Sequence, residues 1–209
     1  MHILIAGGGI GGLTAALAFL KAGHTVSVLE QAPEIADVGA GIQISPNGMK
    51  VLDALGASAR VARDAFRPRA QELRLGRSGG RIFSVPLREA SQARWRGEYL
   101  HIHRADLIEA LQGCVVDRAS DAIRLGARVT AYESSDTGVT AVLSDGEKVT
   151  GDLLVGASMQ KCARMEGSPL PTVPAKQGSG VFSNVSARQV SASLTCRRKR
   201  PISKTFSFH

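Results

Sequence analysis

His2-Ile3-Leu4-Ile5-Ala6-Gly7-Gly8-Gly9-Ile10-Gly11-Gly12 begins the chain with a short apolar run that passes directly into glycines. A continuous apolar run of this kind, ended by glycines, is typical of a buried parallel strand. The next segment repeats apolar residues at helical spacing, and Gly23 is placed to end the helix. Residues 25–30, Thr-Val-Ser-Val-Leu-Glu, then predict a second strand. Strand, helix and strand together make one βαβ unit.

The glycines fit the spacing G-x-G-x-x-G at Gly7, Gly9 and Gly12. In this motif the first glycine permits a tight turn, the second lets the backbone approach a pyrophosphate, and the third lets the helix pack close to the strand. The phosphates lie on backbone N–H groups at the positive end of the helix dipole, where Gly11 also lies. Glu30 ends the second strand, where a carboxylate accepts hydrogen bonds from ribose hydroxyls. The alternative is a glycine turn without a ligand, but the strand, helix and acid around the motif favour dinucleotide binding.

The segments after the βαβ unit favour FAD over NAD. An NAD-type domain continues with another helix and a third parallel strand, whereas this chain continues with a glycine-rich extended segment at residues 39–44. Ser45-Pro46 predicts the start of a helix that Gly56 ends. The other predicted elements are a hairpin of residues 72–75 and 81–87, a strand at 99–103, helices at 106–111 and 118–125, and strands at 129–133, 138–143 and 152–155. We therefore predict an α/β fold with a Rossmann-like FAD-binding βαβ unit, a parallel sheet, an inserted hairpin and a β-meander.

Several segments carry a resemblance to a known family. They are Met1–Leu13, Val28–Glu34, Gly39–Gln43 with Pro46-Asn47, His103–Leu107 and Gly151–Ala157. Together they run through nearly all of the first 157 residues. In these segments the chain resembles the FAD-dependent aromatic-ring hydroxylases, the flavoprotein monooxygenases that include salicylate and 3-hydroxybenzoate hydroxylases.

The resemblance implies cofactor roles for particular residues. The glycine loop would hold the FAD pyrophosphate, and Glu30 would hold the ribose. The segment Gly39–Gln43 would pass near the flavin, and Arg104 would contact the cofactor. Gln31 and Gln43 are further candidates for cofactor binding. For Arg104 the alternative is a solvated charge at a helix start.

Two histidines alternate on a predicted strand, His101 and His103. A catalytic base is one interpretation, and a hydrogen-bonded structural histidine is the one that we favour. We therefore name no catalytic residue from the sequence, and we expect no metal site.

The resemblance also implies the reaction. NADH or NADPH would reduce the flavin, and one oxygen atom from O₂ would be transferred to a small, electron-rich aromatic substrate. The cofactor supplies that chemistry, while the protein orients the aromatic ring and excludes water.

Charge divides the chain at about residue 157. Residues 1–157 hold 17 Lys or Arg and 17 Asp or Glu, whereas residues 158–209 hold 9 basic residues and a single acid. The second part is rich in serine and keeps no apolar period, so it cannot bury enough apolar surface to offset its ordering entropy. We therefore expect an FAD-binding domain at residues 1–157, incomplete relative to the family, and a basic, disordered tail at residues 158–209.

The tail also departs from the pattern of the family. Ser158-Met159-Gln160-Lys161 stands where the family continues with Asp-Gly and an arginine-bearing helix. We interpret this as a reading-frame shift near codon 158, which would leave the chain as written incomplete or inactive. The alternative is a basic arm, with Arg197-Arg198-Lys199-Arg200 contacting nucleic acid. Because no aromatic residues interleave with these charges, we expect no nucleic-acid partner.

Other features bear on the class of protein. Three cysteines share no metal-ligand spacing, and an odd number gives no disulfide framework. No apolar stretch is long enough to cross a bilayer, and the first residues lack the basic region of a signal peptide. We expect a cytoplasmic enzyme without a membrane partner, and the second hypothesis is a non-catalytic dinucleotide-binding fragment.

Overall fold

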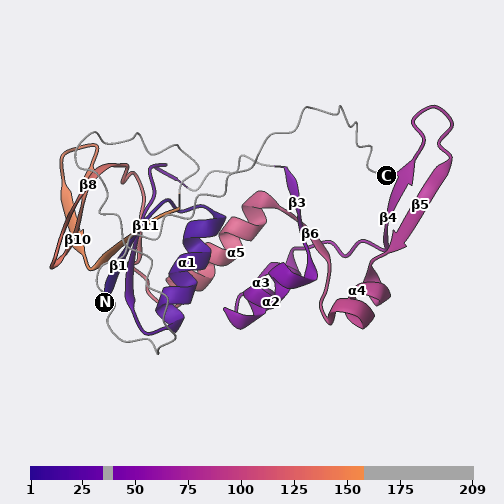
Figure 1. The fold of residues 1–209 in the computed structure, drawn as a ribbon, viewed down its shortest axis with the longest axis horizontal. Helices are drawn as coiled ribbons and strands as arrows, with labels where there is room; N and C mark the ends of the chain where they lie inside the picture. The colour runs from indigo at the N-terminus through magenta and orange to yellow at the C-terminus, as the bar shows by residue number, and fades with distance from the viewer. Residues whose placement is uncertain (35–39, 158–209) are drawn as a thin grey trace, which may run out of the picture.

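The computed structural model describes residues 1–34 and 40–157, which form a mixed α/β fold (Figure 1). The helices are α1 (Ile10–Lys21), α2 (Pro46–Ala54), α3 (Ser58–Arg63), α4 (Arg88–Trp95) and α5 (Arg104–Val116). The strands are β1 (His2–Ala6), β2 (Thr25–Leu29), β3 (Gly41–Ile44), β4 (Ala70–Arg74), β5 (Arg81–Pro86), β6 (Leu100–His103), β7 (Ile123–Arg124), β8 (Val129–Ser135), β9 (Gly138–Leu143), β10 (Lys148–Gly151) and β11 (Leu153–Gly156). The predicted βαβ unit is confirmed as β1, α1 and β2.

A four-stranded parallel sheet forms the centre of the fold, with the strand order β11-β1-β2-β7. α1 connects β1 to β2, and a long excursion then separates β2 from β7. α5 leads out of the excursion into β7 and packs along α1 on the same face of the sheet (Figure 1). The strand order reverses at β1, which has β2 on one side and β11 on the other.

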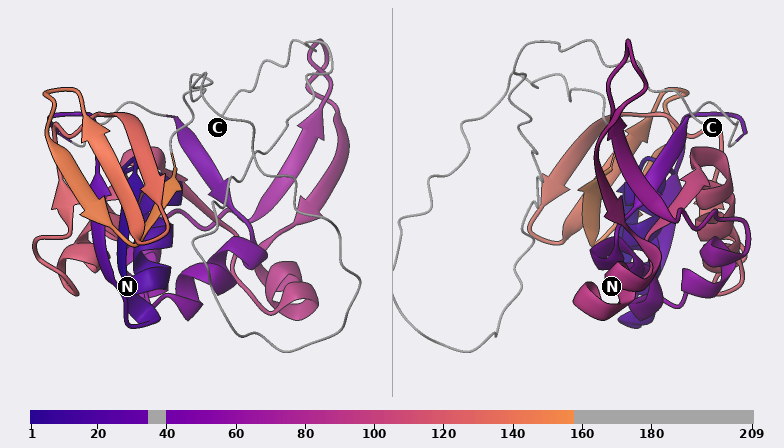
Figure 2. Two further views of the ribbon diagram at one scale, coloured as in Figure 1. Left: turned by 60° about the vertical axis from the view of Figure 1, so that its left-hand side comes forward. Right: turned by 90° about the vertical axis from the view of Figure 1, so that its right-hand side faces the viewer.

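Side chains of β1 alternate between two apolar layers. Ile3 and Ile5 belong to the large core that α1 and α5 share, whereas Leu4 belongs to a smaller cluster on the opposite face. The antiparallel meander β8-β9-β10 covers that opposite face (Figure 2). Burial on both sides explains why the strand is a continuous apolar run rather than an alternating one.

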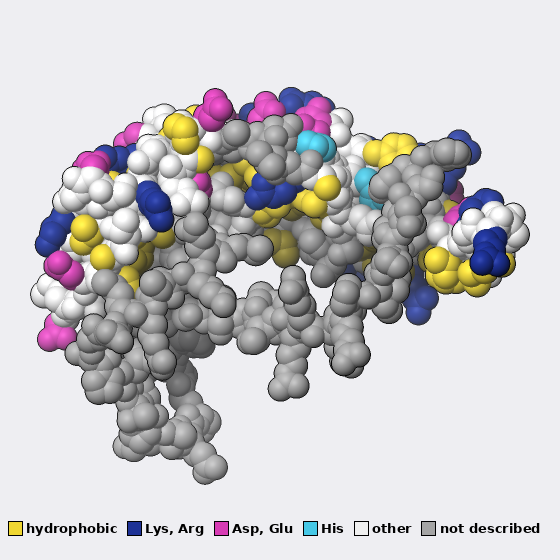
Figure 3. Space-filling view, turned by 90° about the horizontal axis from the view of Figure 1, so that it is seen from above, with side chains coloured by type: hydrophobic (Ala, Val, Ile, Leu, Met, Phe, Trp, Pro, Cys, Tyr) yellow, Lys and Arg dark blue, Asp and Glu magenta, His cyan; other side chains and the backbone are white. Residues whose placement is uncertain are grey.

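The excursion between β2 and β7 builds the part of the fold farthest from the meander. β3 and β6 pair as a two-stranded antiparallel sheet, and α2, α3 and α4 lie around it (Figure 1). The hairpin β4–β5 projects outward, and all of its residues are exposed (Figure 2). Hydrophobic side chains show along this hairpin at the right-hand edge of Figure 3.

The hairpin is amphipathic. Leu73 pairs with Phe83 across the two strands, and Val85 follows on the same face. On the other face the carboxylate of Glu72 accepts hydrogen bonds from Arg74 and Arg81, which lower the pKa of Glu72. The predicted hairpin is thus confirmed, and it starts two residues earlier than expected.

The helix predicted at residues 118–125 is wrong. Turns follow α5, and Ile123 and Arg124 then form β7, which pairs in parallel with Val28 and Leu29 of β2. As a strand, this segment forms backbone hydrogen bonds with the free edge of β2, which it could not form as a helix. Pairing with β2 therefore outweighs the weak helical pattern.

The strand predicted at residues 152–155 exists as β11, but it does not extend the meander. β11 pairs in parallel with β1, and the third strand of the meander is β10, which the sequence reading missed. Leu153, Leu154 and Val155 form an apolar run that suits a position with both faces covered. A turn that contains Gly146, with a φ of 87°, separates β9 from β10.

The start of α2 follows the prediction in part. Ser45 takes the extended N-cap conformation and Pro46 occupies the first turn, and Gly56 lies beyond the end of the helix with a φ of 73°. The Ser45 hydroxyl, however, bonds the side chain of Asn47 and not a helix N–H group.

α3 and α4 were not predicted, because each buries only one residue and so shows no apolar period.

The predictions for residues 158–209, namely disorder, a frame shift or a basic arm, lie outside the described residues. Within the described part of the chain, no helix has the length and apolar character needed to cross a membrane.

Replacing Leu4 with alanine tests the layer between sheet and meander. Leu4 is fully buried, and its truncation should lower the free energy of unfolding by about 2–5 kcal/mol. Leu75→Ala is the matched control, because Leu75 is 54% exposed and should change stability by no more than about 0.5 kcal/mol. Urea denaturation of both variants makes the comparison, and equal losses would contradict the two-sided burial of β1.

Candidate cofactor-binding site

The glycine loop joins the carboxyl end of β1 to the start of α1. Gly7 has a φ of 116°, which L side chains rarely adopt, and its N–H donates to the Leu29 carbonyl at 2.8 Å. Gly9 is the N-cap residue of α1, and no side chain caps the helix there. The first-turn N–H groups of a helix have no intrahelical acceptor. With no acid in the first turn, this helix start can receive an anion.

Gly12 lets α1 approach the loop. A Cβ atom at this position would lie 1.8 Å from the Gly7 carbonyl oxygen and 3.4 Å from the Cβ of Ala157. Every residue other than glycine is therefore excluded from position 12 in this packing. At Gly9 and Gly11, in contrast, a Cβ atom would meet nothing within 4 Å, so that this side of the loop is open.

The loop lies where the parallel sheet reverses its strand order. Ala157, which follows β11, donates its N–H to the Ala6 carbonyl at 2.9 Å, so the ends of β1 and β11 meet beside the loop. In open α/β sheets, ligands bind outside the carboxyl ends of the strands at such a switch point. The geometry of the sheet and the glycine motif therefore both indicate a ligand site at the same edge of the sheet.

Glu30 extends from the end of β2 to the glycine loop. Its carboxylate accepts a hydrogen bond from the Gly8 N–H, and its other oxygen accepts from the Ala32 N–H at 2.9 Å. The motif reading singled out Gly7, Gly9 and Gly12 and missed Gly8. A Cβ atom on Gly8 would lie 3.0 Å from the Cβ of Glu30. The sequence signal that could have identified Gly8 is the run of three consecutive glycines at positions 7–9, because the motif requires glycine only at the first and third of these positions.

Arg104 lies at the same edge of the sheet. It is the first residue of α5, which leads into β7; because β7 is parallel to β1, α5 runs in the same direction as α1. The N-termini of both helices therefore lie toward the carboxyl edge. The backbone N–H of Arg104 donates to the Ala40 carbonyl at 3.3 Å, which places Ala40 against the start of α5.

The two glutamine candidates differ in their surroundings. Gln43 lies on the solvent-facing side of β3, and its amide oxygen accepts a hydrogen bond from the Tyr99 hydroxyl at 2.8 Å. Gln31 follows Glu30 directly and is exposed. The structure brings together the glycine loop and Glu30, and it sets Gln43 on the separate β3–β6 sheet.

His101 and His103 share one face of β6, opposite Gln43 and Gly41 of β3. The His101 ring packs near Phe66 and Tyr99, with ring centroids 6.4 and 5.8 Å away. Partial burial lowers the pKa of His101, since it disfavours the charged imidazolium. The neutral imidazole is the form that this setting favours at pH 7.

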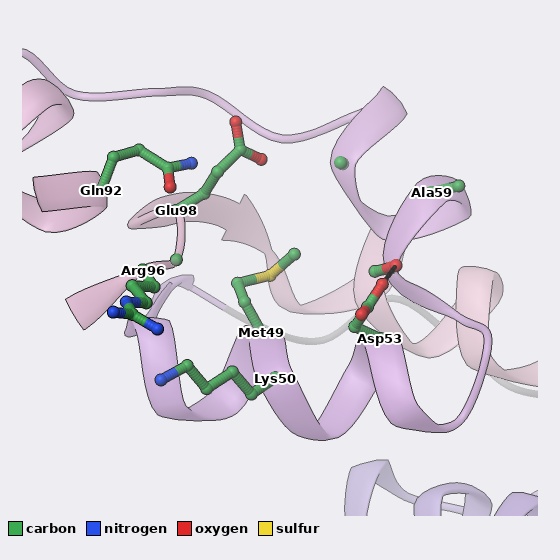
Figure 4. A pocket seen from close by; sticks show the side chains of 10 residues that line it. Met49, Lys50, Asp53, Ala59, Gln92, Arg96 and Glu98 are labelled. Atoms are coloured by element: carbon green, nitrogen blue, oxygen red, sulfur yellow. Dashed lines mark hydrogen bonds between the residues drawn. The ribbon is translucent and has the colours of Figure 1, made fainter.

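Two cavities lie in the excursion. One of about 350 Å³ lies between α2, α3 and α4, and Figure 4 shows Met49, Lys50 and Arg96 among its lining residues. A second of about 630 Å³ shares Gln92 and Glu98 with the first. None of the predicted cofactor-binding residues lines either cavity.

In residues 1–34 and 40–157, no three His, Cys, Asp or Glu side chains gather into a potential metal site.

Comparison with known proteins identifies the family of the chain. The family described as FAD binding domain matches residues 1–196. The chain belongs to this FAD-binding family. The predicted resemblance to FAD-dependent aromatic hydroxylases is thereby confirmed, and FAD is the cofactor.

Individual relatives agree with the family assignment. The chain is 41% identical over 157 residues to 3-hydroxybenzoate 6-hydroxylase 1 of Aquipseudomonas alcaligenes, a match that covers 75% of this chain and 40% of that protein. It is 38% identical over 156 residues to 3-amino-4-hydroxybenzoate 2-monooxygenase PtmB3 of Streptomyces platensis, covering 75% and 39%. The structure of Klebsiella pneumoniae HpxO complexed with FAD and uric acid aligns with a TM-score of 0.64 at 31% identity, covering 74% of this chain and 38% of that one. The chain thus spans about two fifths of the length of the relatives that it matches.

A pair of glycine substitutions tests the loop geometry. Gly12→Ala forces a clash with the Gly7 carbonyl and should lower the free energy of unfolding by about 2 kcal/mol or more. Gly11→Ala, one residue away in the same helix, meets open space and should leave stability unchanged or slightly raised. Thermal denaturation of both variants makes the measurement, and a Gly12→Ala protein with unchanged stability would disprove the close approach of α1 to the loop.

Proposed function

We propose that this chain is the FAD-binding portion of an NAD(P)H-dependent flavoprotein monooxygenase that hydroxylates a small phenolic or aromatic-carboxylate substrate with O₂. The observation that carries the proposal is the uncapped, glycine-lined start of α1 beside the carboxylate of Glu30. The similarity to hydroxybenzoate monooxygenases supports the substrate class. A cytoplasmic location is part of the proposal.

In this proposal the glycine loop holds the pyrophosphate of FAD. Gly7 and Gly12 shape the turn, and the open side of Gly9 and Gly11 lets the phosphates approach the backbone. The first-turn N–H groups of α1 donate to the phosphate oxygens, and the helix dipole favours their negative charge.

Glu30 accepts hydrogen bonds from the adenosine ribose. A carboxylate has about four acceptor positions, so its two bonds to Gly8 and Ala32 leave acceptor capacity for hydroxyls. Arg104 supplies positive charge at the same edge, and Gln31 and Gln43 are weaker candidates for contacts along the cofactor. When bound, FAD supplies the redox chemistry, while the protein positions it and excludes water.

A non-catalytic dinucleotide-binding role is the alternative. It rests on the same glycine loop and Glu30, and the turnover measurement below distinguishes it from the first proposal. The basic arm as a nucleic-acid-binding element concerns residues outside the described part. A filter-binding titration against salt distinguishes it, because phosphate contacts weaken steeply as salt rises.

Cofactor binding provides the direct test. The purified chain should carry flavin absorbance bands at about 370 and 450 nm. Arg104→Gln should weaken FAD binding about tenfold, because a charge-assisted hydrogen bond is lost. Arg94→Gln, at an exposed position on α4, is the control and should bind FAD as the unaltered chain does. Fluorescence titration measures both, and equal affinities would rule out a cofactor role for Arg104.

Turnover is a separate measurement. The FAD-loaded chain should show little or no NADH oxidation stimulated by 3-hydroxybenzoate, because much of the relatives' length is not represented in it. Full-length 3-hydroxybenzoate 6-hydroxylase assayed in parallel is the positive control. Comparable turnover by this chain would instead show that the FAD-binding portion is sufficient for catalysis.

A further inference from the structure

The backbone of Glu30 is hydrogen-bonded to the end of β7 and to the turn that follows it. The Glu30 N–H donates to the Arg124 carbonyl at 2.9 Å, and the Ala127 N–H donates to the Glu30 carbonyl at 2.8 Å. Both main-chain groups of Glu30 are thus bonded to residues almost a hundred positions later in the sequence. None of these later residues belongs to the glycine motif.

The same turn also reaches the carboxylate of Glu30. The Gly126 N–H donates to the Ala32 carbonyl at 2.9 Å, and the Ala32 N–H donates to the Glu30 carboxylate at 2.9 Å. The other carboxylate oxygen accepts from the Gly8 N–H. A continuous chain of hydrogen bonds therefore runs from Gly126 through Ala32 and Glu30 to the glycine loop.

Residues on both sides of the turn contact other parts of the fold. Arg124 forms an ion pair with Glu147, which precedes β10. The side chain of Ala127 is buried with Leu29 in the cluster beneath the meander. Gly126 has a φ of 68°, a left-handed conformation that glycine adopts without strain and most other residues do not.

We propose that Gly126 and Ala127 form a brace that positions the Glu30 carboxylate, and through it Gly8, before the nucleotide binds. This inference rests on the proposed function in one respect, namely that Glu30 binds the ribose of FAD. Gly126 is therefore a positioning residue, which acts through Ala32 and Glu30. β7 adds a further contact to the same residue, since the Arg124 carbonyl accepts a hydrogen bond from the Glu30 N–H.

Gly126→Ala tests the brace in the full chain, with Gly23→Ala as the matched control. Both glycines have positive φ, 68° and 83°, and a Cβ atom at either would meet nothing within 4 Å. Both variants therefore carry the same kind of backbone strain and should lose similar stability in thermal denaturation. Gly23, however, lies beyond the C-terminal end of α1, away from the glycine loop.

Two readouts separate positioning from stability. Hydrogen exchange without FAD should show the Gly8 and Ala32 amides exchanging about tenfold faster in Gly126→Ala and unchanged in Gly23→Ala. FAD affinity, measured by fluorescence titration, should fall about tenfold in Gly126→Ala only. In a Glu30→Ala background, Gly126→Ala should cause no further loss, because its effect passes through the missing carboxylate.

The outcomes distinguish this inference from the proposed function. If the unaltered chain binds no FAD, the proposed function fails, while amide exchange still tests the brace. Equal exchange at Gly8 and Ala32 in the two glycine variants, or equal FAD affinity, overturns the brace. If Gly126→Ala does not fold, Gly126→Asn replaces it, since asparagine tolerates the left-handed conformation. In a folded Gly126→Asn protein, the remaining strain should still speed amide exchange at Gly8 and Ala32 relative to Gly23→Asn, and equal exchange in the two asparagine variants overturns the brace.

Discussion

Helix α1 and the glycine loop approach each other so closely at Gly12 that a single added carbon would overlap the Gly7 carbonyl oxygen. This contact sets the direction in which the helix leaves the sheet, and hence where its first-turn N–H groups point. The positive φ of Gly7 makes the turn possible, and the absence of a side-chain cap leaves the donors for a ligand. The arrangement of these N–H groups is therefore a consequence of packing, and it needs no charged side chain in the loop.

The parallel sheet has to be completed before the site is whole. β1 and β2 come from the first thirty residues, whereas β7 follows the excursion in sequence and β11 follows the meander. β11 brings Ala157 against Gly12, and β7 brings the backbone groups that hold Glu30. The apolar residues of β1 permit this arrangement, since Leu4 and Ile5 offer a buried surface to both layers.

Prediction succeeded where the pattern was local. The spacing of Gly7, Gly9 and Gly12 and the position of Glu30 follow from a βαβ unit whose parts are adjacent in sequence. Prediction failed where a segment could pair with more than one partner. Residues 152–155 have the composition of a strand, yet nothing local says that they lie beside β1 and not beside β9. Ile123 and Arg124 became a strand only because β2 had a free edge.

The sequence by itself determined the βαβ unit, the glycine loop and the acid at the end of β2, because steric and hydrogen-bonding requirements within about thirty residues leave few alternatives. Only the tertiary structure decided that Gly8 lies against Glu30, that Ala127 bonds the backbone of Glu30 and that Gly126 bonds that of Ala32. Hydrogen bonds between segments almost a hundred residues apart depend on which sheet edges are free after folding. No local sequence pattern indicates which edges will pair, because the pairing depends on the packing of the whole domain.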